Sequence, residues 1–195
     1  MNRTADVLDA TLRCLLRYGA RRTTMDDIAT EMGVSRSAVY QYVRSKDDAV
    51  RKLAERLHDR AFEHARAAAA ADAPLADRVH GILSAKVELT LGPFAESPHA
   101  AELLDEQARV SGDICRAFTG DLHGVLTETL AGEFAMPPGD AAQMLLALTV
   151  GLLAAGRTDL LRAASETVLA GLPRPENAQT PTAEVVNLEN TVPEK

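Results

Sequence analysis

The chain has 195 residues, of which 46% are hydrophobic and only 4% aromatic, and it contains no tryptophan. A core of this composition must rest on leucine, valine, alanine and methionine, which favours helices packed on helices over a β-sandwich. The net charge of −7 is unevenly distributed. Residues 1–57 hold 11 basic and 8 acidic side chains (+3), and residues 58–195 hold 10 and 20 (−10). A modestly basic end on an acidic body is typical of a DNA-binding module joined to a second domain.

Composition also argues against several classes of protein. Cys14 and Cys115 form no CxxC pair, so we expect reduced thiols and neither a disulfide nor a zinc site. The five histidines do not fall at metal-ligand spacings, and no cofactor is expected. The first residues contain no apolar stretch of signal-peptide length, and the apolar run 144–156 is shorter than the roughly 20 residues that span a bilayer. We therefore expect a soluble, cytoplasmic protein with no membrane partner.

Helical periodicity begins at the amino terminus. A first helix carries an apolar stripe and ends near Gly19, the stripe being Leu8, Leu12, Leu15 and Leu16. Thr24 and Asp27 have the spacing of a capping box and predict the start of a second helix, which Gly33 ends. Ser35 is a suitable N-cap for a third helix. A long fourth helix is expected from Lys46, because acidic residues follow it in the first turn.

The remaining sequence is also helical in pattern. A helix is expected after Pro74, a break at residues 93–98, and further helices over 100–109, 114–130, 141–155 and 158–170. After Gly171 the chain is rich in Pro, Asn, Thr and Glu, which predicts disorder. We therefore expect an all-α protein with three parts: a helix-turn-helix domain at 1–46, a helical effector-binding and dimerisation domain at 47–172, and a disordered tail at 173–195.

The second and third helices have the spacing of a helix-turn-helix. Ala29 is small where two short helices must approach closely, and Gly33 can adopt a positive φ at the turn. Apolar side chains occupy the positions that would face inward, namely Ile28, Met32, Val34 and Val39. The residues left outside on the third helix would then be free to contact another molecule.

Those outward residues have the chemistry of a DNA-binding face. Arg36 can donate two hydrogen bonds to a guanine edge, and Gln41 can bond an adenine edge in the same way. Phosphate contacts suit Thr24, Ser35, Tyr40, Tyr42 and Lys46. An alternative is that Tyr40 and Tyr42 are half-buried packing residues.

The run "TTMDDIATEMGVSRSAVYQYVRSKDDAVRKL" resembles the amino-terminal domain of TetR-type transcriptional regulators. The resemblance covers roughly residues 5–53 and departs little from the family pattern, which often has Phe at position 43 and His or Tyr at 42. It implies DNA contacts from Thr24, Arg36, Ser37, Ala38, Tyr40, Gln41, Tyr42 and Lys46. It also implies that the helical remainder binds a small-molecule effector and dimerises.

A two-fold dimer would place two reading helices about 34 Å apart, in successive major grooves. The apolar helix 141–155 and the last helix suit such an interface, because small residues at four-residue spacing let helices approach closely. The expected interface residues are Leu145, Leu148, Thr149, Leu152, Leu161, Ala164 and Val168. The alternative is that these residues form the core of a monomer.

An effector pocket is expected between the central helices. Its candidates are Leu83, Val87, Leu91, Phe94, His99, Leu103, Phe118, Leu122, Met144 and Leu148. The polar candidates that could orient a ligand are Glu88, His99, Glu102, Gln107 and Arg109. Each apolar candidate is more often plain core than ligand contact.

The function predicted from these features is that of a repressor released from its DNA operator by a small molecule, through a swing of the long helix that starts at Lys46. An enzyme is disfavoured, because the sequence has no phosphate-binding glycine loop, no HExxH and no GxSxG. The alternative that remains is a helical interaction protein without DNA binding.

Overall fold

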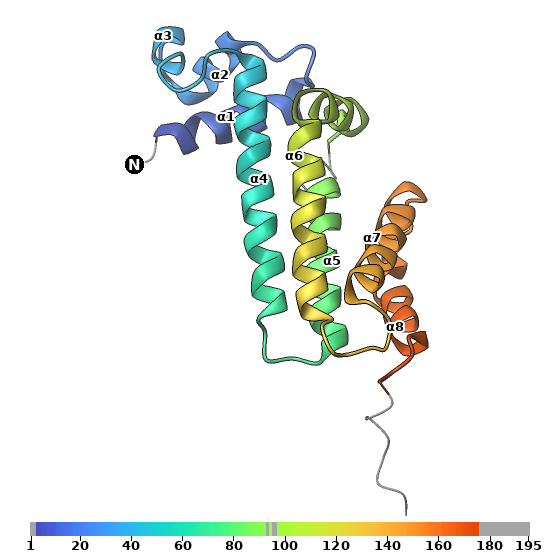
Figure 1. The fold of residues 1–195 in the computed structure, drawn as a ribbon. Coiled ribbons are helices and arrows are strands. Elements are labelled where there is room, and N and C mark those ends of the chain that lie inside the picture. The colour runs from blue at the N-terminus through green and yellow to red at the C-terminus, as the bar shows by residue number, and fades with distance from the viewer. Residues whose placement is uncertain (1–2, 93, 95–96, 176–195) are drawn as a thin grey trace, which may run out of the picture.

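The computed structural model describes residues 3–92, 94 and 97–175, and within these ranges the regular secondary structure is all helical, with no strand (Figure 1). This confirms the predicted all-α class. The helices are α1 (Arg3–Tyr18), α2 (Met25–Met32), α3 (Arg36–Val39), α4 (Lys46–Ala69), α5 (Leu75–Leu91), α6 (Ala100–Thr129), α7 (Pro138–Ala154), the 3₁₀ turn η1 (Thr158–Leu160) and α8 (Leu161–Gly171).

The helices form a small head and a long body (Figure 1). Helices α1, α2 and α3 make up the head, at the end of the molecule where α4 begins. The body is built from α4, α5 and α6, which run side by side, and from α7 and α8, which pack against it away from the head. Because α4 starts at the head and runs along the body, it connects the two parts mechanically.

The turns of the head follow local rules. The Thr24 hydroxyl accepts from the amide of Asp27, and the Asp27 carboxylate accepts from the amide of Thr24, which completes the predicted capping box. Gly33 adopts the left-handed conformation, with φ of 66°, and ends α2. Ser35 then caps α3 by accepting from the amide of Ala38. Gly33 and Ser35 thus define the turn between α2 and α3, and the capping box fixes where α2 begins.

Three groups of buried apolar side chains hold the molecule together. The head has its own small core, which includes Val7, Ile28 and Val39. The main core lies in the body, where Leu83, Leu122 and Leu145 are among its fully buried members. A third group joins head to body and contains Leu8, Leu15, Val50, Leu53, Phe94 and Leu103. The head is therefore packed onto the body, and does not hang from α4 alone.

Helix α6 is interrupted at Ser111, whose φ of −133° and ψ of 21° are not helical. The interruption falls in the gap between the two helices expected at 100–109 and 114–130. Arg51 on α4 spans it: its Nη1 donates to the carbonyl of Val110 at 3.1 Å, and its guanidinium bonds both carboxylate oxygens of Asp113 at 3.0 and 2.6 Å. The kink is thus tied to the first part of α4.

Replacing Arg51 by alanine is expected to loosen this kink. Loss of the donor to Val110 should raise hydrogen exchange at residues 111–115 by about 2- to 10-fold. Hydrogen exchange followed by mass spectrometry measures the exchange rate of these backbone amides. The control is Arg162→Ala, which removes a similarly exposed ion pair between α8 and Asp77 on α5. Unchanged exchange at 111–115 in R51A would contradict the assigned role.

At the carboxyl end, the amide of Ala135 donates to the carbonyl of Pro173 at 2.7 Å, and Leu172 is buried. The predicted disordered tail, 173–195, therefore begins with a residue bonded to the body. Residues 176–195 lie outside the described residues, so the remainder of that prediction and the domain bounds stay predictions. Within the described ranges no helix combines the length and the hydropathy needed to cross a membrane.

Candidate nucleic-acid interface and internal pocket

The outer face of α3 is polar and exposed, as the helix-turn-helix prediction requires. Arg36 and Ser37 on α3 are exposed, and so are Tyr40, at 42%, and Gln41 in the turn that follows the helix. Val39, in contrast, has no exposed surface and packs in the head core. The short helix is therefore oriented by its apolar side, with its hydrogen-bonding side chains turned outward.

Arg36 is positioned by two neighbours. Its Nη1 donates to Asp26 Oδ2 at 3.0 Å, and its Nη2 donates to the Tyr40 hydroxyl at 3.2 Å. The guanidinium carbon also lies 5.6 Å from the centre of the Tyr40 ring. Tyr40 and then Asp26 raise the pKa of Arg36, which keeps it fully charged. To bond a guanine, Arg36 must exchange Asp26 for the base edge.

The other predicted DNA contacts differ in how free they are. The hydroxyls of Ser35 and Ser37 lie 3.0 Å apart on the exposed surface, whereas Ala38 and Tyr42 are half-buried. The hydroxyl of Thr24 is exposed and donates to Asp27 Oδ2 at 2.6 Å. Lys46 donates its ammonium to the carbonyl of Ala20 at 2.8 Å, so it holds α4 to the loop after α1.

Two cations that the sequence analysis did not select lie on the same head. Arg22 and Arg44 are exposed, and within the described residues neither guanidinium makes a hydrogen bond. Both are therefore available to phosphate oxygens. Arg22 stands just before Thr23, and Arg44 just before the α4 N-cap Ser45. A basic residue beside a predicted helix start was a sequence signal that could have identified both.

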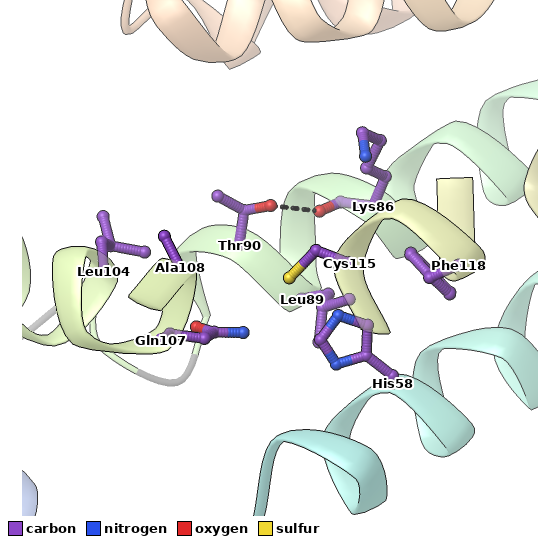
Figure 2. A pocket seen from close by; sticks show the side chains of 9 residues that line it. All are labelled: His58, Lys86, Leu89, Thr90, Leu104, Gln107, Ala108, Cys115 and Phe118. Carbon is purple, nitrogen blue, oxygen red and sulfur yellow. Dashed lines mark hydrogen bonds between the residues drawn. The ribbon is translucent and has the colours of Figure 1, made fainter. Parts of the chain in front are cut away.

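A pocket of about 130 Å³ lies inside the body, between α4, α5 and α6 (Figure 2). It spans the α6 kink, since Gln107 and Ala108 line it on one side of Ser111 and Cys115 and Phe118 on the other. The full lining is His58, Lys86, Leu89, Thr90, Leu104, Gln107, Ala108, Cys115 and Phe118.

Most of the predicted pocket residues lie elsewhere. Of the apolar candidates only Phe118 lines this pocket, and of the polar ones only Gln107. Leu83 and Leu122 are fully buried in the main core. Phe94 and Leu103 line a second cavity of only about 20 Å³ beside the head.

The remaining candidates are spread over the surface of the body. Leu91 and Met144 are exposed, and Val87, Leu148 and His99 are half-buried. Among the polar candidates, Glu88 pairs with His64, Glu102 accepts from the amide of Arg21, and Arg109 pairs with Asp47 and Glu106. None of them lines the pocket between α4, α5 and α6.

The titratable groups of the pocket are shifted towards their neutral forms. Burial lowers the pKa of His58, which is only 4% exposed, and its Nδ1 lies 2.7 Å from the carbonyl of Ala54. Burial also lowers the pKa of Lys86, whose ammonium donates to the Thr119 hydroxyl at 3.0 Å. Burial raises the pKa of the Cys115 thiol, which disfavours the nucleophilic thiolate. In the described part of the chain, no three metal-ligating side chains gather in one place.

The predicted dimer residues divide into two sets. Leu145, Thr149 and Leu161 are buried within this chain, in line with the alternative that they form a monomer's core. Leu148, Leu152, Ala164 and Val168 are half-buried. Three further apolar side chains of this region are exposed, Met144 and Val150 on α7 and Leu160 in η1. An apolar surface therefore remains on this side of the body.

The structure thus combines a helix-turn-helix head with a helical body that contains a small pocket. Residues 7–56 match the model of the family described as bacterial regulatory proteins, tetR family. The amino-terminal part of the chain is therefore similar to this family, in agreement with the resemblance found in the sequence.

Known proteins agree with this assignment. The chain is 31% identical over 113 residues to the HTH-type transcriptional regulator TtgR of Pseudomonas putida, and equally to the probable regulator ArpR of the same species. These matches cover 57% of this chain and 53% of each relative, so they span about half the length of those proteins.

Solved structures show the same fold. The complex of SmeT with triclosan is similar over the whole of both chains, with a TM-score of 0.64 and 21% identity. A putative transcriptional regulator from Pseudomonas aeruginosa PAO1 has a TM-score of 0.65 and 22% identity, over 87% of this chain and 89% of that one. SmeT itself is described as the repressor of the Stenotrophomonas maltophilia multidrug efflux pump SmeDEF. The structure with that description has a TM-score of 0.59 and 22% identity, over 85% of this chain and 86% of that one.

Proposed function

We propose that this protein is a sequence-specific DNA-binding regulator that represses transcription until a small molecule releases it. The observation that carries the proposal is the exposed surface of α3 and of the turn that follows it, where Arg36, Tyr40 and Gln41 are turned outward on the head. Their chemistry suits base edges and phosphates. The family match and the regulators TtgR and SmeT support the same function.

The protein acts as a two-fold dimer through the outer face of α7 and α8. A single short reading helix contacts few base pairs, and paired heads about 34 Å apart bind successive major grooves together. The exposed apolar side chains of Met144, Val150 and Leu160 support this surface, because a dimer would remove them from water.

The effector binds in the pocket between α4, α5 and α6. Helix α4 lines that pocket through His58 and begins beside the head at Lys46. Arg51, between these two residues, ties α4 to the α6 kink. A ligand that spreads α6 at Ser111 would therefore move α4 and with it the head. A preference of ~1–3 kcal/mol for one of the two states would change DNA affinity about 5–150-fold.

A binding experiment with the DNA flanking its own gene tests the proposal. Fluorescence anisotropy of the full chain, repeated over a salt series, should show affinity at least about 10³-fold greater than for unrelated DNA of equal length. Affinity should fall steeply with salt, because phosphate contacts release counterions. Equal affinity for both DNAs, or none for either, would favour the alternative of a helical interaction protein without DNA binding.

A further inference from the structure

The neutral His58 ring offers a hydrogen-bond acceptor to the pocket. Its Nδ1 lies 2.7 Å from the carbonyl oxygen of Ala54, and a carbonyl can only accept. The hydrogen therefore belongs on Nδ1, and Nε2 of the neutral ring carries a lone pair. Burial lowers the pKa of His58; Lys86 acts in the same direction and Asp59 opposes it. The neutral ring is thus the form present near pH 7.

This acceptor is unused within the described part of the chain. His58 is 4% exposed, yet its only hydrogen bond is the one from Nδ1. Figure 2 shows the ring standing against the pocket with its second nitrogen turned towards Leu89 and Cys115. The ring also meets Phe118 edge-on, with 5.3 Å between centroids, so it is held in place. Because no protein group within the described residues donates to this nitrogen, a ligand that supplies a donor can form a hydrogen bond with it.

A second polar group faces the same space. Gln107 is half-buried, and its side-chain amide has no hydrogen bond within the described residues. In Figure 2 it extends from α6 towards His58. An amide can donate to an oxygen that itself donates to His58, and a hydroxyl group on the ligand meets both requirements.

The rest of the pocket sets the size and polarity of the ligand. Leu89, Leu104 and Phe118 supply apolar contacts. The volume of about 130 Å³ is close to that of an engineered apolar cavity, about 150 Å³, that binds benzene. The space therefore suits a single six-membered ring. The Lys86 ammonium is engaged with Thr119, on the α6 turn after Cys115.

We propose that the effector is a small neutral aromatic molecule bearing a hydroxyl group, which donates to Nε2 of His58 and accepts from Gln107. This assigns the ligand class and a specificity-determining residue, and it rests on the proposed function of the pocket as the effector site. A carboxylate that pairs with Lys86 is the competing ligand chemistry.

Titration of the full chain with phenol, toluene and benzoate tests the assignment, with affinities taken from NMR chemical-shift changes and no DNA present. Phenol and toluene have nearly the same shape, so phenol should bind about 10- to 100-fold more tightly if the hydroxyl is bonded to His58. His58→Phe should remove that advantage. The matched control is His64→Phe, the same change at an exposed position on α4. Toluene binding as tightly as phenol, benzoate binding more tightly, or no binding of phenol would each overturn the proposal.

A measurement on the unaltered protein does not depend on whether H58F folds. Long-range ¹H–¹⁵N spectra should show His58 protonated at Nδ1, and phenol but not toluene should shift its Nε2 resonance. Protonation at Nε2 in the free protein would overturn the proposal. Because neither measurement uses DNA, failure here leaves the anisotropy result standing, and failure of DNA binding leaves the ligand assignment testable.

Discussion

Replacing Tyr40 and Gln41 together by alanine is expected to lower affinity for the operator fragment by roughly 10- to 1,000-fold. A bidentate Gln–adenine contact contributes ~1–3 kcal/mol of discrimination, and the Tyr40 hydroxyl adds a phosphate contact that sets register. Tyr40 also accepts from Arg36 Nη2, so its loss leaves the guanidinium less well oriented. Both side chains are exposed, so the fold and the dimer should remain intact.

Fluorescence anisotropy measures this loss, and light scattering together with circular dichroism measures oligomeric state and helicity. The control is Tyr18→Ala, since Tyr18 is also exposed but lies at the end of α1, outside the α3 face. If the double variant keeps the specific affinity of the unaltered chain, α3 is not the reading helix. Equal losses with Y18A would point to a general effect on the head.

The local features of the head could be predicted because each depends on a few neighbouring residues. Thr24 with Asp27, the left-handed Gly33 and the N-cap Ser35 are determined by backbone chemistry within four residues. The pairing of Arg36 with Asp26, ten residues earlier, and of Lys46 with the Ala20 carbonyl depends on how the helices cross. Spacing along one helix contains no information on such contacts.

Most of the predicted pocket residues do not line the pocket between α4, α5 and α6, for a related reason. Helical periodicity shows which side of α5 or α6 faces inward, but it does not show where inward side chains meet a neighbour and where they leave a space. Leu83 and Leu89 both lie on the inner side of α5, yet Leu83 is enclosed by the main core and Leu89 borders the pocket. The pocket lies at the α6 kink, because Ala108 and Cys115, on either side of Ser111, both line it.

The asymmetry of charge has a structural counterpart. The basic residues of the first 57 positions include Arg22, Arg36 and Arg44, which are exposed on the head. The acidic residues beyond position 57 that the structure describes belong to the body, whose helices extend away from α3 (Figure 1). Within one chain this arrangement orients approach to a phosphate backbone, because the body is repelled where the head is attracted. A net negative charge is therefore compatible with DNA binding by the head.

Replacing Leu122 by alanine is expected to lower the free energy of unfolding by about 2–5 kcal/mol, a large share of the roughly 5–15 kcal/mol typical of a domain. Leu122 has no exposed surface and lies among the side chains of the main core, so truncation leaves a cavity that its neighbours cannot close. Chemical denaturation followed by circular dichroism measures the change.

The matched comparison is Leu104→Ala, on the same helix but half-buried at the edge of the pocket. Its truncation enlarges a space that already exists, so the cost should be less than half that of L122A, whereas binding of a ring-sized ligand should weaken. Leu122 was a sequence-based candidate for the pocket, and the two roles predict opposite results: a lining residue changes ligand affinity more than stability, and a core residue does the reverse. Two results would contradict these roles: equal stability losses in the two variants, or a ligand affinity that changes only in L122A. Either result would mean that Leu122, and not Leu104, borders the ligand site.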